Sequence, residues 1–214
     1  MNKDWIDFLA TNTDIPPKPS YVDFPTSSES ITAISNLTIL KVSGKDSSQF
    51  IQGQLACNIN ELTKENSFYT AFCNVKGRTI STLIVLKNND DDFLLVLPAQ
   101  LIEKVSKKLQ MYILRSDVKL TNMTEELCLI GLNTSNTDIF SHIPDVNFAV
   151  SNTDILIIKV PSAYSRYLMI ANTSQAIQHW SRITSDCNIN PSLPDSWDYQ
   201  DISAGIPWLT QETT

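Results

Sequence analysis

The chain has 214 residues, 42% of them hydrophobic, and a formal net charge of −7. Its length and apolar content suffice for a buried core, in one large domain or two small ones. The negative charge argues against a general nucleic-acid-binding surface, although it leaves room for a local basic pocket.

No apolar run is long enough for a signal peptide or a membrane span. The four cysteines are widely spaced and form no C-x-x-C pair, so we expect small buried thiols in a reducing compartment. We therefore predict a cytoplasmic, monomeric protein with no membrane partner and no direct nucleic-acid partner.

Residues 1–30 are predicted to form an N-terminal arm. A short amphipathic piece, residues 5–9, precedes a connector that contains Pro16, Pro17, Pro19 and Pro25. Proline fixes φ and removes a backbone donor, so the connector is expected to be extended.

Residues 31–125 show the pattern of a first subdomain. Asp46 or Ser47 is suited to cap a helix that carries Phe50, Ile51 and Leu55 on one face. A second helix is predicted over residues 99–114, with lysines opposite its apolar face. Hydrophobic alternation predicts strands at residues 37–42, 68–73, 79–86 and 93–97.

The same order returns in a second subdomain, residues 126–214, whose last part we expect to lead toward a further domain. Strands are predicted at residues 127–132, 147–150, 155–160 and 167–171, with helices at 136–142 and 173–184. Two β-α-β-β-β-α units of similar length predict an α+β fold with an internal duplication about a pseudo-twofold axis. A ligand would then bind where the halves meet, because domain interfaces favour pockets.

Familiar catalytic and metal-binding motifs are absent from the sequence. His142 and His179 are far apart, and we expect His179 at the surface or at a helix end. The carboxylates of residues 90–92 are consecutive and diverge, so they are interpreted as a solvated hairpin loop. We predict no catalytic residue and no metal site.

Three stretches carry a family resemblance: VSGKDSSQFIQGQL, the KGR turn, and SWDYQDISAGIPWLTQETT. They are similar to the YgfZ family, folate-binding relatives of the glycine-cleavage T-protein, an aminomethyltransferase. That family's Lys-Gly-Cys-Tyr-x-Gly-Gln-Glu motif would follow Thr214, so we expect a chain truncated before the motif and a C-terminal β-barrel.

The resemblance implies a tetrahydrofolate site. Lys76 and Arg78 flank the glycine of a tight hairpin, either as a solvated turn or, as the resemblance implies, near the glutamate tail of folate. Trp197 matches a tryptophan that contributes to folate recognition in the family, and its alternative is a core tryptophan. Leu37 stands where the family has a second tryptophan. All four residues are predicted to line one cleft.

Ser81 and Thr82 stand where the T-protein enzymes carry an Asp-Asp pair. The carboxylate that serves aminomethyl transfer is therefore missing. The resemblance implies a tetrahydrofolate-dependent accessory factor in iron–sulfur cluster assembly or repair and in tRNA modification, with iron–sulfur enzymes as clients. The alternatives are a folate-dependent aminomethyltransferase or demethylase, and an interaction scaffold whose pocket has lost its ligand.

Overall fold

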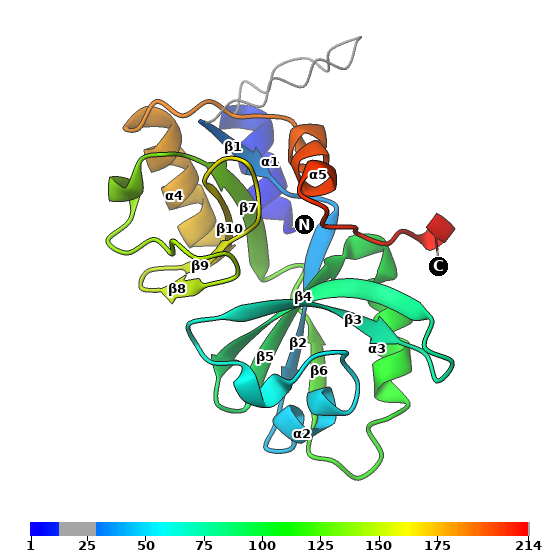
Figure 1. Ribbon diagram of the computed structural model, residues 1–214. Helices are drawn as coiled ribbons and strands as arrows, with labels where there is room; N and C mark the ends of the chain where they lie inside the picture. The colour runs from blue at the N-terminus through cyan, green and yellow to red at the C-terminus, as the bar shows by residue number, and fades with distance from the viewer. Residues whose placement is uncertain (13–28, 214) are drawn as a thin grey trace. The chain divides into compact units, whose positions relative to one another are not determined.

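The computed structural model describes residues 1–12 and 29–213 (Figure 1). Its internal contacts divide the chain into two units. Unit 1 combines residues 1–35 and 125–206, and unit 2 combines residues 36–124 and 207–214. The Pro-rich connector predicted from the sequence lies outside the described residues.

Unit 2 is built on a five-stranded antiparallel sheet with the order β3-β4-β5-β2-β6. Apolar side chains from its central strands and from α3 form the core, among them Leu40, Leu83, Leu95 and Val105. The elements of this unit are β2 (Leu37–Ser43), α2 (Ser47–Gln52), η1 (Ile59–Glu61), β3 (Ser67–Cys73), β4 (Thr79–Asn89), β5 (Asp92–Pro98), η2 (Ala99–Leu101), α3 (Ile102–Gln110), β6 (Lys119–Asn122) and η4 (Gln211–Thr213).

Unit 1 contains a second five-stranded antiparallel sheet, with the order β1-β7-β10-β9-β8. Helix α4 buries Trp180, and Trp5 of α1 meets this ring edge-on at 5.5 Å. The elements are α1 (Lys3–Asn12), β1 (Ser30–Ala33), β7 (Leu127–Asn133), η3 (Thr137–Ile139), β8 (Val150–Asn152), β9 (Leu156–Lys159), β10 (Arg166–Asn172), α4 (Thr173–Ser185) and α5 (Pro194–Ser203).

The two sheets share one strand order. Read from one edge, β3-β4-β5-β2-β6 in unit 2 corresponds to β8-β9-β10-β7-β1 in unit 1. The strand next to β2 at the edge of the unit 2 sheet is β6, which follows α3 in the chain. The corresponding edge strand of unit 1 is β1, which precedes all the other strands of that sheet in the chain. This architecture confirms the predicted α+β class, and the shared order is what an internal duplication requires.

Unit boundaries differ from the predicted subdomains at both ends of the chain. Residues 1–12, predicted to belong to a separate arm, belong to unit 1 because Trp5 and Leu9 bury one face of α1 in its core. Residues 30–33 belong there too, because β1 pairs with β7. Residues 207–214 belong to unit 2. Pairing between distant segments decides these assignments, and local sequence patterns do not carry that information.

Several predicted elements are shorter or displaced. The helix predicted over residues 99–114 begins with the η2 turn and ends at Gln110, and the helix predicted over 136–142 is only the η3 turn. The strand predicted at 147–150 begins only at Val150, because Phe148 adopts a φ of 64° within a turn. Asp46 lies at the N-cap of α2, but its Oδ2 accepts from the Asp117 amide at 2.8 Å instead of capping the helix.

Candidate functional site

A buried cluster joins α5 to the sheet of unit 1. Trp197 is 2% exposed, and the guanidinium carbon of Arg166 lies 4.0 Å from the centroid of its ring. A Cβ added to Gly131 of β7 would lie 2.9 Å from the Trp197 Cδ2 atom and closer still to Cε3 and Cζ3. The indole therefore packs directly on the β7 backbone. This packing matches the core-tryptophan alternative, and the stacking of Trp197 on folate stays a prediction.

Arg166 is the fully buried cation of this cluster. Its Nη2 group donates to Asp201 on α5, and the two side chains are 0% and 4% exposed. Burial lowers the pKa of Arg166, while the nearby carboxylate of Asp201 opposes this shift. The Nε and Nη1 groups have no hydrogen-bond partner among the described residues. The Arg166–Asp201 ion pair and the contact of Arg166 with the Trp197 ring thus help to fix α5 against β10.

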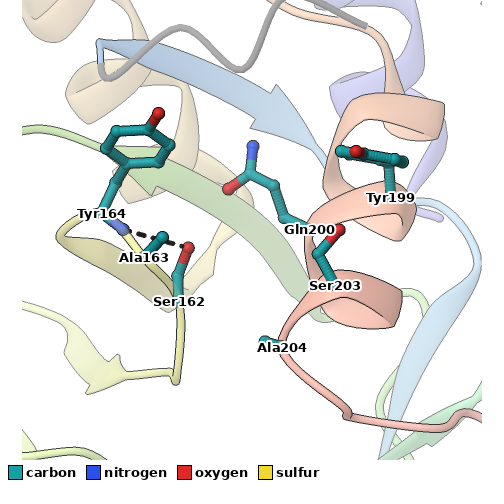
Figure 2. A pocket seen from close by; sticks show the side chains of 7 residues that line it. All are labelled: Ser162, Ala163, Tyr164, Tyr199, Gln200, Ser203 and Ala204. Atoms are coloured by element: carbon teal, nitrogen blue, oxygen red, sulfur yellow. Dashed lines mark hydrogen bonds between the residues drawn. The ribbon is translucent and has the colours of Figure 1, made fainter.

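A hollow of about 200 Å³ lies between α5 and the loop that precedes β10 (Figure 2). The Gln200 amide points into the space between the side chains of Tyr164 and Tyr199. Gln200 is 5% exposed, and its Oε1 atom has no partner among the residues that the structure describes. Ser162, whose Oγ accepts from the Tyr164 amide at 3.4 Å, and Ser203 also line the hollow.

The hollow combines aromatic side chains with Gln200, whose buried Oε1 acceptor has no donor in the part of the chain that the structure describes. A buried carbonyl without a hydrogen bond is costly, and native proteins rarely leave one unpaired. The arrangement suits a small planar molecule that carries an N–H group. No sequence motif pointed to Gln200, Arg166 or Gly131, although an arginine in the apolar stretch RYLMIAN and a glycine in LCLIGLN were visible departures from the pattern.

The other predicted site residues belong to unit 2. Leu37 opens β2, pairs with Pro98 and is 5% exposed, so it is a buried apolar residue, and its place in a ligand cleft stays a prediction. Lys76 and Arg78 are exposed at the β3–β4 turn, and neither has an ion-pair partner among the described residues. Both backbone amides donate to the Asn74 Oδ1 atom, at 2.9 and 3.0 Å, around Gly77 with its φ of 75°. The turn is ordered, and its two cationic groups are available to an anion.

Ser81 and Thr82 both have structural hydrogen bonds. The buried Ser81 hydroxyl donates to the Thr82 carbonyl at 2.8 Å. The Thr82 hydroxyl donates to the Pro207 carbonyl at 2.8 Å and accepts from the Leu209 amide at 3.4 Å. The Thr82 hydroxyl thus holds residues 207–209 on β4, while the Ser81 hydroxyl bonds within β4, and neither supplies a carboxylate.

The histidine prediction is wrong for His179, which is 8% exposed on the inner face of α4. Burial, reinforced by Arg182, lowers its pKa, and its Nδ1 atom has no partner among the described residues. Asp90 is exposed in the β4–β5 turn, while Asp92 pairs with Lys41 at 2.8 Å. Within residues 1–12 and 29–213, no three His, Cys, Asp or Glu side chains are grouped to hold a metal ion, and no helix there could cross a bilayer.

Residues 26–138, more than half of the chain, match the model of the GCVT N-terminal domain family, and the chain belongs to that family. It is 26% identical over 187 residues to the tRNA-modifying protein YgfZ of Colwellia psychrerythraea, covering 85% of this chain and 56% of that protein. The aminomethyltransferase of Bacillus cytotoxicus is 23% identical over 196 residues, covering 84% of this chain and 53% of its own length.

Among solved structures, the glycine cleavage system aminomethyltransferase T from Bartonella henselae matches with a TM-score of 0.73. The match covers 83% of this chain and 51% of that one at 15% identity, so it shows the fold alone. These matches confirm the family resemblance seen in the sequence. The chain spans about half the length of the relatives it matches.

Proposed function

We propose that this chain is a folate-binding protein of the YgfZ type. It acts as a tetrahydrofolate-dependent accessory factor in iron–sulfur cluster assembly or repair and in tRNA modification. Its membership of the GCVT N-terminal domain family supports the proposal, as does its similarity to a relative named as a tRNA-modifying protein.

The observation that carries the folate part is the hollow beside Tyr164 and Tyr199, which is also lined by Gln200, whose buried Oε1 atom has no partner among the described residues. A pterin is flat and carries ring N–H donors, so it suits an amide acceptor near aromatic side chains. Complete small-molecule sites usually occupy about 300–1,000 Å³. A hollow of about 200 Å³ therefore fits one ring system rather than a whole folate molecule.

The residues predicted from the sequence enter this proposal through the family resemblance and not through the hollow, because Leu37, Lys76 and Arg78 belong to unit 2. Lys76 and Arg78 bind the glutamate carboxylates of folate, because such anions need cationic donors that an acidic chain must supply locally. Leu37 contributes apolar surface. Trp197 contacts the ligand or, from its buried position, holds α5 in place through Arg166.

Titration of the full chain with tetrahydrofolate by calorimetry tests this proposal. Gln200→Leu removes the acceptor and is expected to weaken binding by about 1–3 kcal/mol. Gln178→Leu, at an exposed position on α4, is the matched control. Unchanged affinity in a folded Gln200→Leu variant, or no binding by the wild type, would contradict the folate assignment.

A second candidate, an aminomethyltransferase, is favoured by the similarity to the Bacillus cytotoxicus protein. It is disfavoured by Ser81 and Thr82, whose hydroxyls are engaged in structural hydrogen bonds. We expect no tetrahydrofolate-dependent release of ammonia from an aminomethylated carrier protein. Release that is abolished by Thr82→Val, with the fold intact, would establish the transferase instead.

A further inference from the structure

One face of unit 2 combines exposed apolar side chains with a surface hollow. Tyr112, in the loop after α3, lines a hollow of about 340 Å³ together with Val75 of the β3–β4 turn and residues 53–56. Gly53 and Gln54 also line an adjoining hollow that reaches Arg115. We call the surface formed by residues 53–56, 73–78 and 107–115 the hairpin face.

The hairpin face carries the large exposed hydrophobic side chains of unit 2. Among the described residues of that unit, those recorded as exposed are Val75 at 90%, Met111 at 63%, Tyr112 at 42% and Leu114 at 86%. Scattered apolar residues on a surface are ordinary, but a cluster around a hollow marks an interaction site.

The charge of this face is opposite to that of the chain. Neither residues 66–89 nor residues 104–116 contain an Asp or Glu, although the chain as a whole carries −7. The acidic residue that lines the hollow at Arg115 is Asp46, whose Oδ2 atom accepts from the Asp117 amide. The face presents Lys76, Arg78, Lys107, Lys108 and Arg115, and none of them has an ion pair with a described residue. Elsewhere in unit 2, by contrast, four lysines are paired: Lys41, Lys45, Lys64 and Lys87.

We propose that the hairpin face binds an acidic protein segment that inserts an apolar side chain into the hollow at Tyr112. Charge complementarity selects an anionic partner and accelerates its association. Val75, Met111 and Leu114 favour a protein over a nucleic acid. Sites for single-stranded nucleic acids add several aromatic rings, on which bases stack, to a basic groove, and the exposed large side chains of this face include a single tyrosine.

Selection from a random peptide library on the immobilised full chain tests this inference. The same selection is run on a Lys107→Glu/Arg115→Glu variant. The best peptide is then labelled, and its dissociation constant is measured by fluorescence anisotropy for both proteins. A mixed-sequence single-stranded RNA oligonucleotide serves as a competitor. We expect the selected peptides to be net acidic and to contain a large apolar residue.

Matched variants separate this surface from general effects. Lys107→Glu/Arg115→Glu should raise the dissociation constant of the best peptide about tenfold or more, and Val75→Ser should raise it about fivefold. Lys3→Glu on α1 and Val146→Ser, both at exposed positions of unit 1, should change the dissociation constant by less than about twofold. The variants leave Gln200, Lys76 and Arg78 intact, so tetrahydrofolate binding is tested separately.

Three results would overturn the inference. The first is a selected pool without an acidic excess. The second is a best peptide that binds the hairpin-face variants as tightly as it binds the wild type. The third is RNA that binds more tightly than the best peptide and displaces it, which would make this a nucleic-acid surface.

Discussion

Replacing Gly131 by alanine should destabilise unit 1 through one steric overlap. The added methyl group would lie 2.9 Å from the Trp197 Cδ2 atom and closer to two further ring atoms. The Trp197 ring cannot easily move away, because the guanidinium carbon of Arg166 lies 4.0 Å from its centroid and Arg166 is itself paired with Asp201. Overpacking of a core by a methyl group typically costs about 1–3 kcal/mol.

Backbone strain does not explain such a loss, because Gly131 has no positive φ. Without the overlap, alanine in place of glycine in a strand would stabilise the protein by roughly 0.5–1 kcal/mol. Gly53→Ala is the matched control, since its added Cβ would meet nothing closer than the Phe50 carbonyl oxygen at 3.5 Å.

Urea unfolding followed by far-ultraviolet circular dichroism measures both variants, because this signal does not depend on the indole. Trp197→Ala should cost about 3–5 kcal/mol by itself. In that background Gly131→Ala should become neutral or stabilising, which gives a coupling energy of at least about 1 kcal/mol. If Gly131→Ala lowers the free energy of unfolding equally with and without the indole, the contact between residue 131 and the Trp197 ring does not determine the stability of this cluster.

Three further outcomes follow from the structure. Asp201→Asn should destabilise the protein by about 3–5 kcal/mol in urea unfolding, because it removes the carboxylate that is paired with the buried Arg166 cation. The double variant Arg166→Met/Asp201→Leu should recover most of that loss. The pKa of His179 is lowered in the folded state, so the unfolded state binds a proton first and the free energy of unfolding falls as pH drops below about 6.5. His179→Leu should reduce this fall, and an equally steep dependence of stability on pH in the variant would contradict a buried, neutral His179. Leu37→Trp should leave the affinity for tetrahydrofolate equal or higher in calorimetric titration. A clear loss of affinity would argue against a ligand beside residue 37.

Local patterns were sufficient for most strands. Apolar stretches placed the strands that became β2, β4 and β5. These strands are buried over consecutive residues, and β5 is buried at every residue after Asp92, because both of their faces are covered. The glycine of the KGR turn located the β3–β4 hairpin, since Gly77 adopts a positive φ there. Two rounds of the same element order also indicated the shared strand order of the two sheets.

Side-chain roles were less predictable where a residue's partner lies far away in the chain. The sequence singled out Trp197 for its indole, but Gly131 and Arg166, which contact that ring, are 66 and 31 positions away. Gln200 carried no motif, and only the packing of α5 shows that its Oε1 atom has no partner among the described residues. His179 was expected at the surface or at a helix end, whereas the structure buries it on the inner face of α4.

The sequence by itself determined the α+β class, the family and the positions of most strands, because these depend on short-range periodicity and recognisable stretches of residues. Only the tertiary structure decided the outer strand of each sheet, the assignment of residues 1–12 to unit 1, and the cluster of Trp197, Arg166 and Asp201. The physical reason is that these features depend on contacts between residues far apart in sequence. Such contacts form when apolar faces and buried charges find partners in three dimensions, and no local pattern specifies which partners those will be.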